Sequence, residues 1–190
     1  MTTNLTRISA APGSGKTRYI TNRVIGALFR DEPVLLVSLD PDRDGYAEDI
    51  ENLGARAHYH DCEIHPGEGA ALGRNLTYIC WARHKADGGG EVAPQGYRHL
   101  VDQLRVEPSS PLRPATWGRK TLVIVDGCEW LGRKPVFEYA AHVRAFIADC
   151  LADGHTVIAC GERDGDTRWL EQVEGGSSGA QPPSALCAAS

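Results

Sequence analysis

A phosphate-binding loop near the amino terminus is the feature that most constrains how this chain can fold. Residues 10–17 read Ala-Ala-Pro-Gly-Ser-Gly-Lys-Thr, which is the P-loop pattern with Ala10 in place of its usual first glycine. A short apolar segment ending at Ile8 precedes the loop, and an amphipathic segment beginning near Lys16 follows it. This order of strand, glycine-rich turn and helix is the context in which backbone N–H groups can surround an anionic polyphosphate.

The residues of the loop match the chemistry of a bound nucleoside triphosphate. Gly13 and Gly15 allow a tight turn and a close approach of the backbone to phosphate. Lys16 can reach the β- and γ-phosphates and act in catalysis, and the Thr17 hydroxyl can complete the coordination shell of Mg²⁺. We therefore expect ATP and Mg²⁺ as the bound groups. The expected nucleotide-binding residues are Pro12, Gly13, Ser14, Gly15, Lys16 and Thr17.

Length and composition limit the remaining possibilities. With 190 residues, the chain has room for one ordinary domain with a full hydrophobic core. A net charge of -5 disfavours general attraction to nucleic acid, although a local basic patch is compatible with it. There is no apolar run of the roughly 20 residues that a membrane span needs, and no signal-peptide pattern, so we expect a cytoplasmic protein without a membrane partner. The 6 cysteines show no tight spacing, which predicts reduced, buried thiols.

Strand and helix patterns alternate along the chain, which predicts an α/β fold. Such alternation favours a three-layer sandwich in which helices cover both faces of a mostly parallel sheet. We expect one P-loop domain over residues 1–174 and a disordered tail over 175–190, where apolar residues are few. The Gly-, Pro- and Ser-rich segments 85–96 and 105–119 are predicted to be loops flanking a short helix, either as lids over the nucleotide or as plain surface excursions.

Individual elements follow from the spacing of apolar residues. The helix after the P-loop should bury Ile20, Val24, Ala27 and Leu28, and the run from Val34 to Leu39 is typical of a strand covered on both sides. Further strands are expected at 6–10, 55–59, 76–82, 122–125 and 156–160, and Tyr46, Ile50 and Leu53 should form one stripe of a helix. A helix is also expected over 136–152, with Phe137, Ala141, Val143, Ile147 and Leu151 mostly inward.

Asp126 is the candidate for the second half of the nucleotide site. It ends the apolar run Leu-Val-Ile-Val-Asp, and a carboxylate that holds the nucleotide's metal usually ends a strand beside the P-loop strand. We therefore expect Thr17 and Asp126 to bind Mg²⁺, with the strand of Asp126 adjacent to the first strand. The alternative is a strand that ends in a turn-forming Asp-Gly pair.

Two further charged residues are candidates for catalysis. Glu129 could orient or deprotonate the attacking water or hydroxyl, or could stabilise the start of a helix. Arg163 follows the last strong strand and could neutralise charge that develops during phosphoryl transfer, or could belong to a solvated loop. Trp130, beside Glu129, is expected to pack in the core.

A group of potential zinc ligands lies in the middle of the chain. His58, His60, Cys62 and His65 fall within eight residues, and alternate positions of one strand would place 58, 60 and 62 on one face. Three alternating ligands do not easily make a tetrahedron, so the alternative of a polar edge strand stays open.

With these motifs established, the chain resembles P-loop NTPases with a RecA-like core. The segment 151–166 and the overall size are similar to thymidine kinases, a resemblance that implies roles for Lys16, Thr17 and Asp126. The chain departs from the kinase motif Asp-Glu-x-Gln-Phe, because the catalytic Glu of that motif falls on Gly127. The zinc-binding lasso of those kinases has no counterpart after residue 166.

The chain also resembles the first motor domain of helicases, on the P-loop, the strand segments 34–40 and 55–60, and Gly161. Because a helicase motor closes ATP between two such domains, this resemblance implies an accessory ATPase that acts with a partner on nucleic acid. The two resemblances predict a nucleoside kinase with a deoxynucleoside acceptor or a helicase-like accessory ATPase. Gly127 at the position of the usual catalytic Glu adds a third alternative, a nucleotide-gated binding module without turnover.

Overall fold

The computed structural model describes residues 4–43, 45–53, 56–59, 62–64, 72–80, 119–133 and 136–171. The strands are β1 (Leu5–Ser9), β2 (Val34–Ser38), β3 (Arg56–Tyr59), β4 (Cys62–Ile64), β5 (Leu76–Cys80), β6 (Leu122–Asp126) and β7 (Thr156–Gly161). The helices are α1 (Lys16–Phe29), α2 (Ala47–Leu53), α4 (Ala140–Ala152) and α5 (Asp164–Thr167), with short 3₁₀ helices η1 (Leu72–Asn75), η2 (Cys128–Gly132) and η3 (Val136–Tyr139).

The described strands form one sheet, in the order β1-β7-β6-β2-β5-β3-β4. Every neighbouring pair is parallel except β3 and β4. Three of the central strands, β2, β5 and β6, are buried along their whole length, as apolar strands covered on both faces should be. The prediction of an α/β fold with a mostly parallel sheet is confirmed.

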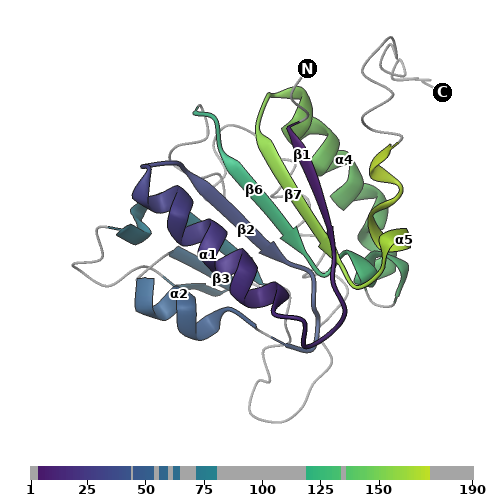
Figure 1. The fold of residues 1–190 in the computed structure, drawn as a ribbon, viewed down its shortest axis with the longest axis horizontal. Coiled ribbons are helices and arrows are strands. Elements are labelled where there is room, and N and C mark those ends of the chain that lie inside the picture. Colours follow the sequence, from purple (N-terminus) through teal and green to yellow (C-terminus); the bar gives the residue numbers. More distant parts are fainter. Residues whose placement is uncertain are drawn as a thin grey trace, which may run out of the picture.

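The position of β6 differs from the sequence expectation. β7 lies between β1 and β6, so the strand that ends at Asp126 is not adjacent to the P-loop strand. The two loops nevertheless meet, because the carboxyl ends of parallel strands lie at one edge of the sheet (Figure 1). Asp126 therefore reaches the P-loop across the end of β7.

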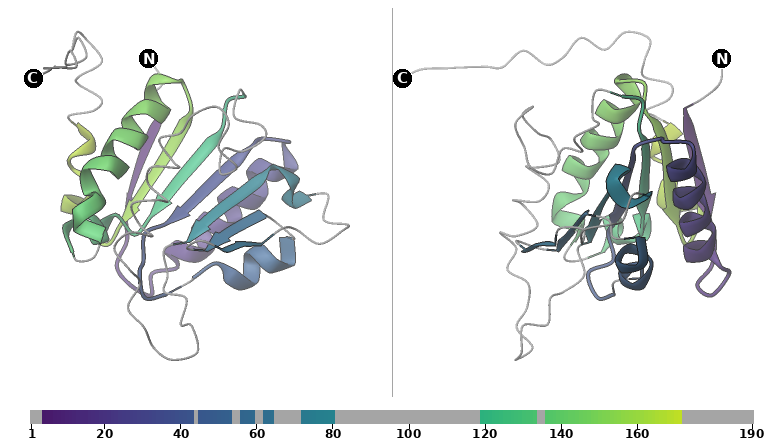
Figure 2. Two further views of the ribbon diagram at one scale, coloured as in Figure 1. Left: turned by 180° about the vertical axis from the view of Figure 1, so that it is seen from behind. Right: turned by 90° about the vertical axis from the view of Figure 1, so that its left-hand side faces the viewer.

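Two hydrophobic cores lie on opposite faces of the sheet. One contains the inward faces of α1 and α2, and the other contains α4 together with Leu170 and η2. Figure 1 shows α1 and α2 in front of the sheet, and the views in Figure 2 place α4 behind it. The helices thus cover both faces, as the sequence predicts.

Helix α1 follows its predicted pattern. Its buried residues are the four expected ones, Ile20, Val24, Ala27 and Leu28. The helix ends at Phe29, and Asp31 adopts a left-handed conformation with φ 57° before Pro33 begins the approach to β2. This helix fixes the position of the loop that precedes it, because its apolar face is packed on the sheet.

The segment 136–152 differs from the single helix that the sequence predicts. It begins as η3 and continues as α4, and Phe137 is 59% exposed rather than inward. Ala141 is also exposed, whereas Val143 and Ile147 are buried as expected. The 3₁₀ turn has a shorter period than an α-helix, so extending the α-helical pattern back through it assigns the wrong face to Phe137.

The histidine-rich segment is a hairpin. β3 and β4 pair antiparallel, with Tyr59 opposite Cys62 and His58 opposite Glu63. Positions 58, 60 and 62 are therefore not alternate residues of one strand, and that premise of the zinc hypothesis is wrong. The side chains of His58, His60, Cys62 and His65 lie outside the described residues.

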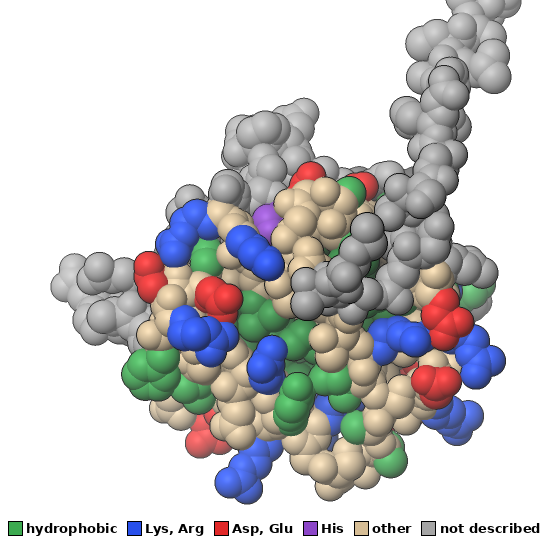
Figure 3. Space-filling view, turned by 45° about the horizontal axis from the view of Figure 1, so that its top comes forward, with side chains coloured by type: hydrophobic (Ala, Val, Ile, Leu, Met, Phe, Trp, Pro, Cys, Tyr) green, Lys and Arg blue, Asp and Glu red, His purple; other side chains and the backbone are tan. Residues whose placement is uncertain are grey.

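Several other predictions also fall outside the described residues. These are the segments 85–96 and 97–104, nearly all of 105–119, and the tail 175–190. Cys80, Cys128, Cys150 and Cys160 are buried free thiols, as expected. Among the described helices, none combines the length and apolar character that crossing a bilayer requires. On the face seen in Figure 3, basic and acidic side chains are interspersed.

Candidate functional site

The loop between β1 and α1 is a turn that depends on two glycines. Gly13 and Gly15 have φ of 78° and 89°, a region that disfavours other residues. A Cβ at either position would meet no atom within 4 Å, so the space beside the loop is open. The Ser14 N–H donates to the Ala11 carbonyl at 3.1 Å and is therefore used within the loop, not held free for a ligand as the sequence analysis expected.

The first turn of α1 faces this open space. Gly15 is the N-cap, no side chain caps the helix, and the first turn contains no acidic residue. The backbone N–H groups at the start of a helix and the positive end of its dipole favour anions when no side chain satisfies them. The loop can therefore receive an anion in the way the sequence predicts.

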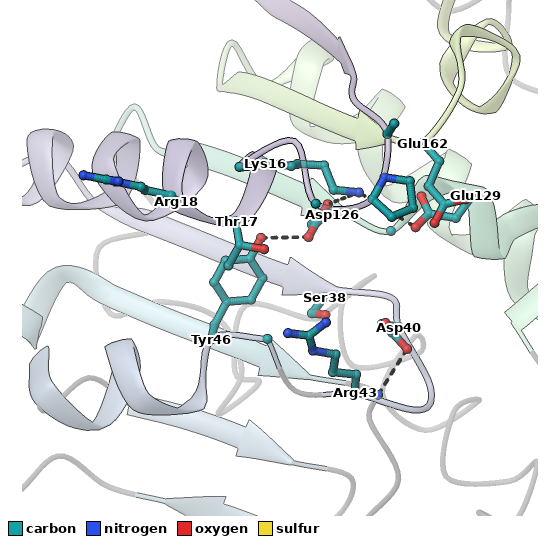
Figure 4. Close-up of a pocket in the computed structure, with 16 residues that line it drawn as sticks. Lys16, Thr17, Arg18, Ser38, Asp40, Arg43, Tyr46, Asp126, Glu129 and Glu162 are labelled. Carbon is teal, nitrogen blue, oxygen red and sulfur yellow. Dashed lines mark hydrogen bonds and ion pairs between the residues drawn. The ribbon is translucent and has the colours of Figure 1, made fainter.

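Lys16 is the cation at the centre of the site. Its Nζ lies 3.3 Å from Asp126 Oδ1 and 3.9 Å from Glu129 Oε1, and all three side chains are largely buried (Figure 4). Burial alone would lower the pKa of the Lys16 ammonium, but the charges of Asp126 and Glu129 outweigh it and raise the pKa. Lys16 is therefore charged, and it is held by two carboxylates.

Asp126 is held from a second side by Tyr46. The Tyr46 hydroxyl donates to Asp126 Oδ2 at 2.7 Å. The other carboxylate oxygen, Oδ1, is buried and accepts no hydrogen bond among the described residues, although it faces Lys16. The carboxylate thus has one oxygen fixed by a neutral donor and one oxygen directed toward a cation.

Gly127 makes a tight turn directly after Asp126. It has φ 86°, and a Cβ there would lie 3.3 Å from the Asp40 backbone nitrogen and 3.3 Å from Trp130. The chain then enters η2, whose turn brings Glu129 into the pocket. The residue directly after Asp126 is thus a tight backbone turn, and the next carboxylate in the pocket is that of Glu129.

Replacing Gly127 with alanine should lower the stability of the fold. A left-handed backbone and the close Asp40 and Trp130 contacts together predict a loss of about 1–3 kcal/mol in the free energy of unfolding. This corresponds to a fall of about 3–10 °C in the thermal midpoint. Gly132→Ala is the matched control, because a Cβ there meets nothing within 4 Å. Equal thermal midpoints for the two variants would contradict the conclusion that the turn at position 127 requires glycine.

Glu129 has the environment of a base. It is 9% exposed, and its Oε2 accepts no hydrogen bond among the described residues. Burial is the main cause that raises the pKa of Glu129, with further contributions from Asp126 and Glu162, while a backbone hydrogen bond and the nearby Lys16 oppose them. A raised pKa brings a carboxylate closer to the value that suits proton abstraction near neutral pH.

These residues line one pocket of about 430 Å³ at the carboxyl edge of the sheet. Six of its residues were not identified from sequence as parts of the site: Arg18, Ser38, Arg43, Gly45, Tyr46 and Glu162. Tyr46 was read as part of an apolar stripe, and the signal that could have found it is the polar, Gly-containing segment that follows β2 at the same edge. The lining residues are Ala11, Pro12, Gly13, Gly15, Lys16, Thr17, Arg18, Ser38, Asp40, Arg43, Gly45, Tyr46, Asp126, Gly127, Glu129 and Glu162.

The segment after β2 forms one wall of the pocket. Asp40 Oδ1 accepts hydrogen bonds from the backbone N–H groups of Asp42 and Arg43, at 2.9 and 3.1 Å, which fixes the turn. Figure 4 shows the Arg43 guanidinium directed toward Ser38 and Tyr46. Asp40 thus acts in this structure as the acceptor that shapes the turn carrying Arg43.

Of the two alternatives for Arg163, the structure favours an exposed loop position over a place beside the phosphates. Arg163 is exposed and is absent from the lining of this pocket, and its backbone N–H donates to Asp166 Oδ2 at 2.7 Å at the start of α5. The chain after β7 contributes Glu162 to the pocket instead. Trp130 packs against the core cluster that contains α4, as expected, with the Arg133 guanidinium over its ring.

The residues fit a magnesium ion that is shared with a phosphate ligand. Among the described side chains, no group of three or more His, Cys, Asp and Glu could hold a metal by itself. Mg²⁺ prefers one or two protein oxygens together with phosphate and water. Asp126 Oδ1, a buried oxygen that faces the Lys16 ammonium at 3.3 Å, and the Thr17 hydroxyl can supply these protein oxygens.

Comparison with protein-family models and with curated protein sequences finds no match.

Proposed function

We propose that this protein is a P-loop NTPase that binds a magnesium–nucleoside triphosphate and cleaves or transfers its γ-phosphate. The observation that carries the proposal is the position of the Lys16 ammonium, 3.3 Å from Asp126 and 3.9 Å from Glu129 beside an open glycine turn. A cation, a metal-binding carboxylate and a base are thus gathered within the span of a triphosphate.

Each group has a distinct task in this proposal. The backbone N–H groups of Gly13 and of Gly15 to Thr17 surround the phosphates, and Lys16 neutralises charge on the β- and γ-phosphates. Glu129 accepts the proton of the attacking water or hydroxyl through the carboxylate oxygen that has no hydrogen bond among the described residues. Asp126 and Thr17 hold Mg²⁺, which supplies charge neutralisation at the phosphates when it is bound.

We also propose that the fold is RecA-like. The P-loop strand, the interposed β7 and the strand ending in Asp126 bring the phosphate loop and the metal carboxylate to one edge, and helices cover both faces. This arrangement is compatible with both resemblances drawn from sequence, the thymidine kinases and the helicase motor domain. It does not decide whether the phosphoryl acceptor is water or a nucleoside hydroxyl, because both reactions need the same groups around the phosphates.

The placement of Glu129 favours turnover over a binding module without activity. The absence of an acidic residue at 127 suggests a missing base, but η2 brings Glu129 to 3.9 Å from Lys16. A buried carboxylate with one oxygen that accepts no hydrogen bond among the described residues, 3.9 Å from Lys16, supports a chemical role.

Labelled ATP tests the proposed reaction and its acceptor in one assay. The protein is incubated with ATP labelled at the γ-phosphate and Mg²⁺, alone, with a mixture of deoxynucleosides, or with single-stranded DNA. Label in inorganic phosphate indicates hydrolysis, and label on a deoxynucleoside indicates a kinase. Stimulation by DNA favours the accessory ATPase. Binding of ATP with no transfer of label under any condition would contradict the proposed turnover.

Glu129→Gln should separate turnover from stability. The substitution keeps the shape of the side chain but removes the base, so we expect turnover to fall by about 100-fold or more with nucleotide affinity little changed. Because the folded pKa of Glu129 lies above its ordinary value of 4.5, the folded state loses stability as pH rises through these two values. The glutamine variant lacks this loss, so its thermal midpoint at neutral pH should exceed that of the wild type. Unchanged turnover would exclude Glu129 as the base.

A further inference from the structure

Tyr46 reaches the pocket from a buried position. It precedes α2, is 2% exposed, and packs edge-on against Tyr78 with 5.9 Å between ring centroids. Its hydroxyl nevertheless donates to Asp126 Oδ2 at 2.7 Å. A phenol keeps its proton at neutral pH, so the hydroxyl is the donor and the carboxylate the acceptor in this contact.

The hydroxyl of Tyr46 also connects Asp126 with Thr17. The Thr17 side chain hydrogen-bonds with Tyr46, and Figure 4 shows the two hydroxyl groups together opposite the Asp126 carboxylate. A phenol has a single proton, and Tyr46 gives that proton to Asp126. Thr17 must therefore donate to the Tyr46 oxygen, which leaves the lone pairs of the Thr17 hydroxyl for another partner.

The same arrangement selects one oxygen of Asp126. Oδ2 is occupied by Tyr46, whereas Oδ1 is buried, accepts no hydrogen bond among the described residues and lies 3.3 Å from Lys16 Nζ. Fixing Oδ2 sets the rotation of the carboxylate and directs Oδ1 toward the cationic side of the pocket. Outer partners of this kind commonly orient the groups that bind a metal.

We propose that Tyr46 is a positioning residue that holds Thr17 and Asp126 in the orientation that binds magnesium. The inference rests on the function proposed above, since it assigns to Tyr46 the task of orienting the two magnesium ligands of that site. The competing explanation is a core tyrosine whose hydroxyl is merely satisfied by the nearest carboxylate. The two explanations differ in whether the hydroxyl affects metal affinity.

Tyr46→Phe tests the inference by a magnesium titration. The variant keeps the ring that packs on Tyr78 and removes only the hydroxyl. Binding of a non-hydrolysable ATP analogue is measured by calorimetry over a range of Mg²⁺ concentrations and in EDTA. We expect the half-saturating Mg²⁺ concentration to rise by about 10-fold or more, as for other outer partners of a metal site. Affinity for the analogue in EDTA should be unchanged. Tyr78→Phe is the matched control and should behave as the wild type.

A double-mutant cycle shows whether Tyr46 acts through Asp126. In an Asp126→Asn background, Tyr46→Phe should cause a smaller change in the Mg²⁺ dependence than in the wild type, because one of the two ligands that it orients no longer binds the metal. Equal and independent effects in both backgrounds would overturn the inference.

The outcomes separate this inference from the proposed function. A wild-type protein that binds no analogue would overturn both. A wild type with Mg²⁺-dependent binding and a Tyr46→Phe variant with the same half-saturating Mg²⁺ would overturn the role of Tyr46 alone. A Tyr46→Phe chain that fails to fold while Tyr78→Phe folds would assign the hydroxyl to the fold and would also overturn the inference.

Discussion

Replacing Lys16 with alanine is expected to abolish triphosphate binding at working concentrations. The ammonium is the group that would contact the β- and γ-phosphates, and truncating one partner of a buried charged contact costs about 3 kcal/mol, or about 100-fold in affinity. Turnover should fall at least as far. Calorimetric titration of the variant with a non-hydrolysable ATP analogue and Mg²⁺ measures the loss.

Arg23→Ala is the control for this substitution. Arg23 is an exposed cation on the same helix and does not line the pocket, so its removal should change affinity by less than about two-fold. Retained affinity in Lys16→Ala would place the phosphate site elsewhere in the chain.

The same substitution also alters the response of the free protein to metal. In Lys16→Ala, the carboxylates of Asp126 and Glu129 lose the cation that lies between them, with side chains only 13% and 8% exposed. Mg²⁺ without nucleotide should therefore raise the thermal midpoint of the variant more than that of the wild type, where Lys16 competes for the same oxygen. A smaller or equal shift in the variant would argue against competition between Lys16 and Mg²⁺ for Asp126 Oδ1.

The ion pairs of Lys16 also predict how stability depends on pH. Because its folded pKa is raised above the ordinary value of 10.5, these pairs contribute fully below that pH, and their contribution is lost as the pH rises through the folded pKa. As the pH rises above 10.5, the wild type should therefore lose more stability than Lys16→Ala. Thermal midpoints of both proteins, measured over this alkaline range, test the difference.

Asp126→Asn should impair the protein when magnesium is present but should not weaken nucleotide binding when magnesium is absent. In Mg²⁺, turnover is expected to fall by about 100-fold or more, because the metal contributes several kcal/mol of charge stabilisation during phosphoryl transfer. In EDTA, the variant should bind the ATP analogue at least as tightly as the wild type, because a carboxylate that repels the phosphates has been removed. Paired titrations with Mg²⁺ and with EDTA measure both effects.

Asp49→Asn is the matched control for Asp126→Asn. Asp49 is a partly buried carboxylate that also accepts a hydroxyl hydrogen bond, from Thr21 at 2.7 Å, but it does not line the pocket. This variant should keep the wild-type response to Mg²⁺. If Asp126→Asn also kept that response, Asp126 would not be the metal ligand.

The sequence predicted those parts of the candidate site that depend on the succession of strand, loop and helix along the chain. A P-loop requires a strand before it and a helix after it, and these are adjacent in the chain, so Gly13, Gly15 and Lys16 could be assigned directly. Asp126 was found because it ends an apolar strand, and the carboxyl ends of parallel strands meet at one edge. These inferences need no knowledge of which strands are neighbours.

Other features depend on contacts between distant segments and could not be obtained in this way. The insertion of β7 between β1 and β6 is a property of strand order, which the alternation of strands and helices does not specify. Tyr46 has the spacing of a core residue, and its hydrogen bond joins positions 80 residues apart. Glu129 enters the pocket because the chain makes a left-handed turn at Gly127. Its distance from Asp126 along the sequence does not reveal this turn.

The most direct test of the account is a calorimetric titration of the wild-type protein with a non-hydrolysable ATP analogue, in Mg²⁺ and then in EDTA. The account predicts saturable binding of one analogue per chain that is competed by inorganic triphosphate and is weaker without Mg²⁺. A protein that gives no saturable heat in Mg²⁺, or whose binding is indifferent to inorganic triphosphate, would contradict the claim that Gly13 to Thr17 and Asp126 form a triphosphate site.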